Sequence, residues 1–296
     1  MIKVNKISKI LNGKCQIIGN EDNWFDHIKE LGKESNNSLV WISPSKKNKE
    51  KLVKETRARV VICDRSLINL DMPDDKTLIC VDNPRLAFSR IVENLFKKIK
   101  SPLIHPSAQI HIKSSIGNNC FIGQNTIIGK SQIGDNCQIF GNVTIYDNVN
   151  ISNNCIIHSG SVIGVDGFGF VKNKENIYEK VEHIGSVEIG KNVEIFSNVS
   201  IARGSISETK ICDGVKINNN SHIAHNVHIA EDVIITANVS ICGSVKIEEG
   251  SWIGPSSVIR DGLKVGRKGV LGMGSVLTKN LPKNQIWIGN PARRKD

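Results

Sequence analysis

Aromatic residues are scarce in this sequence, at 5% of 296 residues. Few side chains are therefore available to stack on bases, and no helix-turn-helix, zinc-finger or RNP signature is present, so we expect no nucleic-acid partner. The scarcity of aromatics, together with abundant Ile, Val, Gly and Asn, disfavours a helical bundle. It favours many short strands separated by turns.

Paired cysteines and long apolar runs are also missing. The eight cysteines form no CxxC pair and no signal peptide precedes them, which predicts a protein of the reducing cytoplasm. No apolar run approaches the ~20 residues that a membrane-spanning helix requires, so any membrane contact should be peripheral.

Acidic residues are outnumbered, and the formal net charge is +10. Lysines concentrate in residues 43–54 and 96–100, and a basic "RRK" stands at 293–295. Such a charge suggests an anionic partner: a nucleotide sugar, an acidic carrier protein or an anionic membrane surface.

A strict six-residue repeat is the main pattern in the sequence. From residue 211 onward, every sixth position is aliphatic: Ile211, Ile217, Ile223, Ile229, Ile235, Ile241, Ile247, Ile253, Ile259, Val265, Leu271 and Leu277. Neither a helix, with a 3.6-residue period, nor a simple strand, with a two-residue period, produces this pattern. A left-handed parallel β-helix does, because each unit of six forms one side of a triangular coil and points one aliphatic residue inward. The fold class is therefore predicted as mainly β. We expect cysteines 120, 137, 155, 212 and 242 to be small side chains that pack within the coils rather than redox-active or metal-binding groups.

The repeat also organises the rest of the chain. It extends back to residue 104, with a one-residue slip near Ile127 and Ile128, and is broken once, between Ile163 and Ile184, which predicts a loop insertion at 165–183. Residues 1–100 lack the repeat and predict a small α/β domain, with strands in 38–43, 59–64 and 77–82 and a helix over 83–99. We therefore expect this domain, a β-helix over 101–281 and a tail at 282–296.

Three histidines stand within "HIAHNVHIAED" (222–232). His222 and His228 each precede an inward Ile on successive sides of the coil, so they point about 120° apart and cannot share a metal ion. His225 falls near a corner and faces outward. An imidazole there titrates near neutral pH and can act as a general base if a second copy of the chain covers it, with a backbone N–H of a neighbouring coil stabilising the oxyanion. Alternatively, His225 is an ordinary surface residue.

Three motifs carry a resemblance to a known family. The segments "HSGSVIGVDGFGF" (158–170), "IARGSISET" (201–209) and "NNNSHIAHNV" (218–227) resemble successive motifs of the UDP-3-O-acylglucosamine N-acyltransferases of lipid A biosynthesis. "VDNPRLAFSRI" (81–91) resembles the end of that family's uridine-binding domain. The resemblance implies transfer of a 3-hydroxyacyl group from acyl carrier protein to the amine of a UDP-linked, 3-O-acylated glucosamine, with no tightly bound cofactor. The β-helix architecture predicts a homotrimer, because proteins of this class usually associate with threefold symmetry.

The resemblance also implies site residues. His225 matches the family's catalytic base, and a backbone amide near 243–245 is expected to stabilise the oxyanion. The residues expected to contact the substrate are Trp41, Asp166, Gly167, Phe168, Gly169, Phe170, His222 and Asn226. Gly243 is expected near the acyl donor. Pro291 and Arg293, in the C-terminal tail, are expected near the donor if it is acetyl-CoA. No metal ligand is expected.

The sequence departs from the family at several of its motifs. A second family histidine corresponds to Gly262, and two acidic positions hold Ala202 and Asn218. Trp41 can supply one of the two aromatics that sandwich uracil, whereas Lys46 stands where the other is expected.

The C-terminus departs as well, and two alternatives therefore stay open. The tail "IWIGNPARR" resembles the ending of acetyl-CoA-dependent hexapeptide acetyltransferases, so one alternative is a nucleotide-sugar acetyltransferase that uses coenzyme A. The other is a non-catalytic solenoid that only binds.

Overall fold

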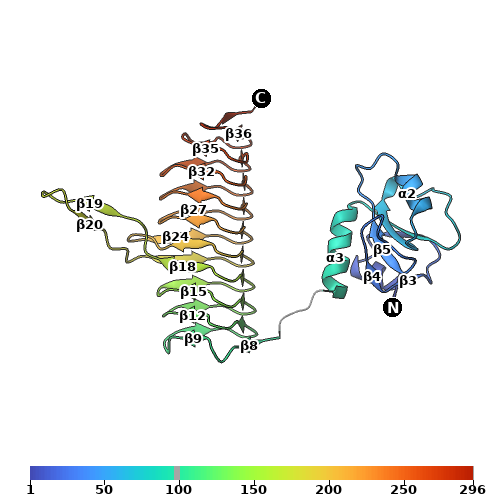
Figure 1. Cartoon of the computed structure of the whole chain (residues 1–296), viewed down its shortest axis with the longest axis horizontal. Helices are drawn as coiled ribbons and strands as arrows, with labels where there is room; N and C mark the ends of the chain where they lie inside the picture. Colours follow the sequence, from blue (N-terminus) through green and yellow to red (C-terminus); the bar gives the residue numbers. More distant parts are fainter. Residues whose placement is uncertain (97–100, 296) are drawn as a thin grey trace. The chain divides into compact units, whose positions relative to one another are not determined.

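The computed structural model describes residues 1–96 and 101–295 and divides the chain into two compact units, Met1–Ile99 and Lys100–Asp296 (Figure 1). No helix among these described residues is long and apolar enough to cross a membrane.

The first unit is an α/β domain around a five-stranded sheet of order β2-β7-β6-β5-β4. Its elements are β1 (Ile2–Lys3), α1 (Asn5–Ile10), β2 (Gln16–Gly19), β3 (Trp24–Phe25), β4 (His27–Ile28), β5 (Ser38–Trp41), α2 (Lys49–Glu55), β6 (Val60–Asp64), the 3-10 helix η1 (Arg65–Leu67), β7 (Thr77–Val81) and α3 (Pro84–Phe96). Helices α1 and α3 pack on one face of the sheet and α2 on the other. The three strands and the helix predicted in this region are confirmed; the predicted end of the helix, 97–99, falls outside the described residues.

The second unit is a β-helix whose strands form three sheets (Figure 1). All of their strand pairs are parallel except the last, which joins the two C-terminal strands of the largest sheet. The eight-stranded sheet contains β10 (Ser115–Ile116), β13 (Gln132–Ile133), β16 (Val149–Ile151), β21 (Ser186–Ile189), β24 (Glu208–Ile211), β27 (His228–Ile229), β30 (Lys246–Ile247) and β33 (Lys264–Val265). The eleven-stranded sheet contains β8 (Leu103–Ile104), β11 (Phe121–Ile122), β14 (Gln138–Ile139), β17 (Ile156–Ile157), β22 (Glu194–Ile195), β25 (Lys216–Ile217), β28 (Ile234–Ile235), β31 (Trp252–Ile253), β34 (Val270–Leu271), β36 (Ile286–Ile288) and β37 (Arg293–Arg294). The nine-stranded sheet contains β9 (Gln109–Ile110), β12 (Ile127–Ile128), β15 (Thr144–Ile145), β18 (Val162–Val165), β23 (Ser200–Ala202), β26 (His222–Ile223), β29 (Ser240–Ile241), β32 (Val258–Ile259) and β35 (Val276–Leu277).

The aliphatic repeat forms the core of this unit. Each of the twelve positions predicted to point inward from Ile211 to Leu277 is at most 1% exposed. Successive turns pair in register, as Ile241 does with Ile259. Asparagines occupy many corners with positive φ, Asn226 (φ 59°) and Asn238 (φ 58°) among them, because asparagine tolerates the left-handed conformation better than most residues.

The predicted insertion is a β-hairpin rather than an irregular loop. Strands β19 (Phe170–Lys172) and β20 (Tyr178–Lys180) pair antiparallel and project from the β-helix (Figure 1). The prediction that the repeat resumes at Ile184 is wrong, because the Ile184 side chain is 70% exposed. The repeat resumes in β21 (Ser186–Ile189), where Val187 and Ile189 are buried.

The prediction of a single break is wrong. Residues 203–207 make a second one, between β23 and β24, because this segment carries no aliphatic residue in register: Ile206 is 82% exposed. The tail continues the β-helix, since β36 pairs with β34 and Ala292 is fully buried.

Candidate active site

His225 lies on the corner between the nine-stranded and the eight-stranded sheets, and we call this corner the His225 edge. It consists of the residues that connect each strand of the first sheet to the following strand of the second. His222 is exposed in β26 of the nine-stranded sheet, whereas His228 is in β27 of the eight-stranded sheet, so the predicted divergence of these two side chains is confirmed. In the described part of the chain, no group of three or more His, Cys, Asp or Glu residues could hold a metal ion.

Asn226 is held rigidly beside His225. Its backbone N–H donates to Thr209 Oγ1 at 2.9 Å, and its Nδ2 donates to Ser207 Oγ at 2.9 Å. Its Oδ1 accepts from the backbone N–H of Ser205 at 3.1 Å and from the Ser205 hydroxyl at 2.9 Å. Ser205 and Ser207 belong to the second break in the repeat, and Thr209 is in β24 directly after it, so this short insertion helps to fix Asn226.

The same contacts determine which nitrogen of His225 carries a proton. His225 Nδ1 lies 3.0 Å from Asn226 Oδ1. The Ser205 N–H can only donate, so the Asn226 atom that it meets must be the amide oxygen, and His225 Nδ1 must donate to that oxygen. The neutral ring therefore keeps its lone pair on Nε2, where it can accept a proton.

A second histidine, His183, packs edge-on against His225. The ring centroids are 5.3 Å apart and the ring planes meet at 66°. His183 is only 5% exposed, and its Nδ1 donates to the Val181 carbonyl at 2.8 Å. Its lone pair is therefore also on Nε2.

Three glycines make this packing possible. A Cβ on Gly243 would lie 2.7 Å from His225 Cε1, and a Cβ on Gly167 would lie 2.5 Å from His183 Nε2 and 3.0 Å from His225 Cβ. A Cβ on Gly169 would lie 3.0 Å from His183 Cε1. Gly167 and Gly169, which are expected to contact the substrate, thus also let the loop pack closely against His183.

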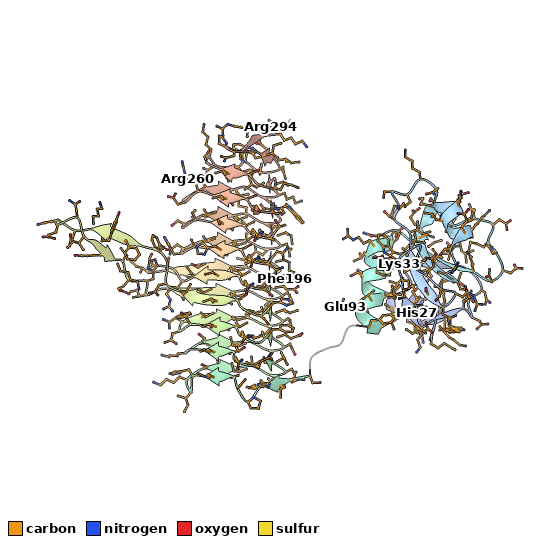
Figure 2. All side chains as sticks on the ribbon, viewed as in Figure 1. His27, Lys33, Glu93, Phe196, Arg260 and Arg294 are labelled. Carbon is orange, nitrogen blue, oxygen red and sulfur yellow. The ribbon has the colours of Figure 1, made fainter. Side chains whose placement is uncertain are left out.

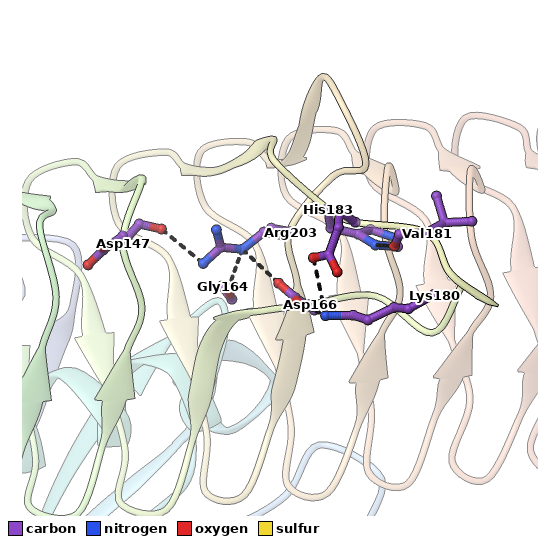
Figure 3. Close-up of polar contacts among 8 residues, drawn as sticks. Asp147, Gly164, Asp166, Lys180, Val181, His183 and Arg203 are labelled. Carbon is purple, nitrogen blue, oxygen red and sulfur yellow. Dashed lines mark hydrogen bonds and ion pairs between the residues drawn. The ribbon is translucent and has the colours of Figure 1, made fainter. Parts of the chain in front are cut away.

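Charged residues anchor the base of the hairpin (Figure 3). Arg203 donates through Nε to the Gly164 carbonyl at 2.7 Å and lies 3.6 Å from Asp166 Oδ1. Lys180 pairs with Asp166 Oδ2. The hydrogen bond from Lys180, with the positive charges of Lys180 and Arg203, holds the pKa of the Asp166 carboxyl below its ordinary value despite partial burial.

The remaining residues of the loop are exposed. Phe168 is 90% exposed and Phe170 is 45% exposed, and their rings lie 5.0 Å apart. Both lie at the start of the projecting hairpin, where they add apolar surface next to the anchored Asp166.

Trp41 lies in the first unit, at a pocket of about 450 Å³. Its ring packs against Phe88 of α3 at 6.0 Å, and Lys46 lines the same pocket. Phe88 was not predicted as a site residue, although it belongs to the "VDNPRLAFSRI" segment.

The predicted donor residues separate into two places. Gly243 is one turn beyond His225 on the His225 edge, where the Ser244 N–H donates to the His225 carbonyl at 2.9 Å. Pro291 and Arg293 lie at the last turn, Arg293 in β37 of the eleven-stranded sheet, and not on the His225 edge.

The departures from the family can also be located. Gly262 is on the His225 edge, and its N–H donates to the Gly243 carbonyl at 2.9 Å. Ala202 is buried at the end of β23, and Asn218, which follows β25, accepts a hydrogen bond from the Asn219 N–H. Ala202 and Asn218 therefore supply no charge at the two positions where the family has acidic residues.

Two family models match the β-helix. Bacterial transferase hexapeptide (six repeats) matches residues 130–164 and 208–243, and the hexapeptide repeat of succinyl-transferase matches 244–279. A Helicobacter pylori protein named UDP-3-O-acylglucosamine N-acyltransferase is 36% identical over 229 residues, which cover 72% of this chain and 67% of that protein. The chain belongs to the UDP-3-O-acylglucosamine N-acyltransferase family.

Other members match over shorter stretches. A Rhodopseudomonas palustris protein named UDP-3-O-acylglucosamine N-acyltransferase 2 is 34% identical over 47% of this chain, which is 37% of its own length. A Marinomonas member is 50% identical over 20% of this chain and 17% of its own length. The chain thus spans well under two thirds of these two relatives.

Solved structures support the fold. LpxA from Acinetobacter baumannii superposes with a TM-score of 0.60 at 26% identity, covering 65% of this chain and 73% of that one. The UDP-N-acetylglucosamine acyltransferase of Campylobacter jejuni superposes with a TM-score of 0.59 at 24% identity, covering 66% and 74%. The predicted β-helix is confirmed.

Sequence reasoning missed His183, Arg203 and Ser205 as parts of this site. A signal was present, since all three are polar residues within segments where the six-residue repeat fails, His183 and Arg203 at an end of theirs. Insertions in a solenoid fold back on one face, and their ends are therefore close to one another in space.

Proposed function

We propose that this protein is an N-acyltransferase that moves a 3-hydroxyacyl group from acyl carrier protein to the amine of a UDP-linked, 3-O-acylated glucosamine. Family membership supports this reaction class. The observation that carries the assignment is the His225–Asn226 contact at 3.0 Å, which leaves His225 Nε2 free to accept a proton.

In the proposed reaction, the amine nitrogen attacks the thioester carbonyl carbon and a C–N bond forms. His225 Nε2 takes a proton from that nitrogen, and the oxyanion then collapses with cleavage of the C–S bond. The leaving thiolate receives the proton from His225, so one imidazole acts first as base and then as acid.

The backbone N–H of Gly243 is the proposed oxyanion donor. It forms no hydrogen bond with the rest of the described chain. Gly243 lies on the turn next to His225, so close that a Cβ there would meet the His225 ring. A preorganised donor of this kind contributes about 3 kcal/mol to transition-state stabilisation.

The pocket at Trp41 is the proposed site for the uracil ring. Trp41 and Phe88 supply aromatic surface, and Lys29 and Lys46 line the same pocket with positive charge suited to a nucleotide. UDP should quench the fluorescence of this protein and lose this effect in Trp41→Ala.

A homotrimer is the proposed assembly, in the cytoplasm. Large apolar side chains are exposed on two of the three sheets, among them Trp252 (47%) of the eleven-stranded sheet and Ile127 (45%) of the nine-stranded sheet. The outward positions of the eight-stranded sheet are instead polar, as at Glu188, Lys210 and Lys246. This contrast favours association through the two apolar sheets. Light scattering of the full chain tests it, and a monomer would contradict it.

Transfer itself is tested with purified protein, an amino-sugar nucleotide and two donors, 3-hydroxyacyl carrier protein and acetyl-CoA. We expect the carrier-bound thioester to be consumed, and His225→Ala to slow transfer by about 100- to 10,000-fold. The acetyltransferase alternative, motivated by Pro291 and Arg293 in the tail, predicts consumption of acetyl-CoA instead. Absence of turnover with every acyl carrier would refute the proposal.

A further inference from the structure

The imidazole of His183 has an unused acceptor next to the proposed base. Its Nδ1 donates to the Val181 carbonyl, and no hydrogen bond to its Nε2 occurs among the described residues. In the same part of the chain, no fully buried side-chain nitrogen or oxygen lacks a partner. The Nε2 of His183 must therefore be reached by solvent, although the residue as a whole is 95% buried.

Two imidazoles, each with a free acceptor nitrogen, thus pack against each other. His225 and His183 have ring centroids 5.3 Å apart, each ring has its Nδ1–H committed to a protein oxygen, and each keeps Nε2 as an acceptor. Gly167 lies against both residues: a Cβ there would be 2.5 Å from His183 Nε2 and 3.0 Å from His225 Cβ, so any side chain would collide with the His183 acceptor.

An amine matches this pair of acceptors and a hydroxyl does not. A neutral primary amine carries two N–H groups and one lone pair, whereas a hydroxyl carries a single O–H. When one N–H points at His225 Nε2 and the other at His183 Nε2, the tetrahedral geometry of the nitrogen directs its lone pair away from both rings, toward the acyl donor. A hydroxyl can satisfy only one ring.

We propose that His183 is an acceptor-binding residue that makes this enzyme select an amine over a hydroxyl; the inference rests on the proposed acyl transfer. The proton that leaves goes to His225. The N–H that remains in the amide product is the one that His183 accepts, and an ester product would have no such hydrogen.

The first test compares acceptors with a common 3-hydroxyacyl carrier donor. One acceptor is the UDP-linked, 3-O-acylated glucosamine, and the other is the matched sugar with a hydroxyl in place of the amine. We expect His183→Leu to lower kcat/KM for the amine by about 10- to 100-fold and to change turnover of the hydroxyl by less than about 2-fold. His183→Gln, which keeps an acceptor oxygen, should retain most of the amine preference. Equal losses with both acceptors, or no loss with either, would overturn the inference.

A second test does not depend on turnover of the hydroxyl. Calorimetric binding of the amide product is compared with binding of its N-methyl analogue, which has no amide N–H. Wild type and His183→Gln should bind the product more tightly than the analogue, by about 10-fold or more, whereas His183→Leu should bind both alike. The inference fails if wild type does not discriminate. The proposed function is judged separately, by whether wild type transfers acyl groups and His225→Ala does not.

Discussion

The Nδ1 of His225 donates to the side-chain oxygen of Asn226 at 3.0 Å, and that oxygen also accepts from the backbone of Ser205. One fixed amide therefore sets both the orientation and the protonated nitrogen of the imidazole. Three of the hydrogen bonds that hold this amide come from Ser205 and Ser207, in a break of the six-residue repeat, and one comes from Thr209 in β24.

Asn226→Gly should lower kcat by about 10- to 100-fold while the fold is retained. Glycine accepts the positive φ of this corner at no steric cost, so the loss reports the missing acceptor for His225. Asn226→Asp, which preserves an acceptor oxygen, should lose much less. Steady-state kinetics measures kcat of each variant, and circular dichroism checks that its fold is retained. Equal activity of Asn226→Gly and wild type would show that the contact between His225 and Asn226 is not needed.

Gly243→Ala should reduce kcat/KM by about 100-fold. The new Cβ would lie 2.7 to 2.8 Å from His225 Cε1 and Nε2, so the ring must shift, and small displacements of a catalytic group are costly. The matched control is Gly262→Asn, one turn further along the His225 edge, where φ is positive and nothing lies within 4 Å of the added carbon. The control should keep wild-type activity, and an active Gly243→Ala would argue against the placement of the reaction at this ring.

Lys180→Met should raise the pKa of Asp166 toward its ordinary value of 3.8. The pKa of Asp166 is lower in the folded protein than in the unfolded chain. The ion pair with Lys180 therefore stabilises the hairpin base fully above about pH 3.8, and this stabilisation is lost as the pH falls through the folded-state pKa of Asp166. Carboxyl chemical shifts of Asp166 followed by NMR between pH 6 and about 2 measure the difference. Glu182→Gln, which alters a more exposed partner of Lys180, is the control and should have a smaller effect; an unchanged midpoint in Lys180→Met would contradict the assignment.

Lys76→Met should destabilise the first unit by about 1–3 kcal/mol. The Lys76 ammonium is buried and donates to the carbonyls of Val53, Lys54 and Thr56 at the C-terminal end of α2, where the helix dipole favours a positive charge. Urea denaturation of the full chain, monitored by a spectroscopic signal from the first unit, measures the change in the free energy of unfolding. Lys54→Met, which removes an exposed side chain on the same helix, should cost less than about 0.5 kcal/mol. Equal effects of the two substitutions would show that the capping bonds contribute nothing.

The β-helix could be predicted because its determinant is local and repeated. Ile223, Ile241 and Ile259 recur at fixed spacing, and burial of one aliphatic residue per side of the coil admits few other folds. The divergence of His222 and His228 followed from the same periodicity. The strands and helix of the first unit were similarly visible as short apolar runs and as a helical spacing.

The hairpin and the partners of His225 could not be predicted in this way. The six-residue pattern predicts that the repeat resumes at Ile184, yet Ile184 is exposed and follows a hairpin whose antiparallel pairing obeys no six-residue rule. His183 reaches His225 across 42 positions of sequence, and Arg203 reaches Gly164 across 39, through contacts that no spacing specifies.

The sequence alone therefore determined the coil, its inward ladder and the corner that carries His225, because hydrophobic burial at a fixed period leaves few alternatives. Only the tertiary structure decided which nitrogen of His225 is free and which imidazole stands beside it. Those features depend on hydrogen bonds and close glycine contacts between segments that meet only when the insertions fold back onto the β-helix.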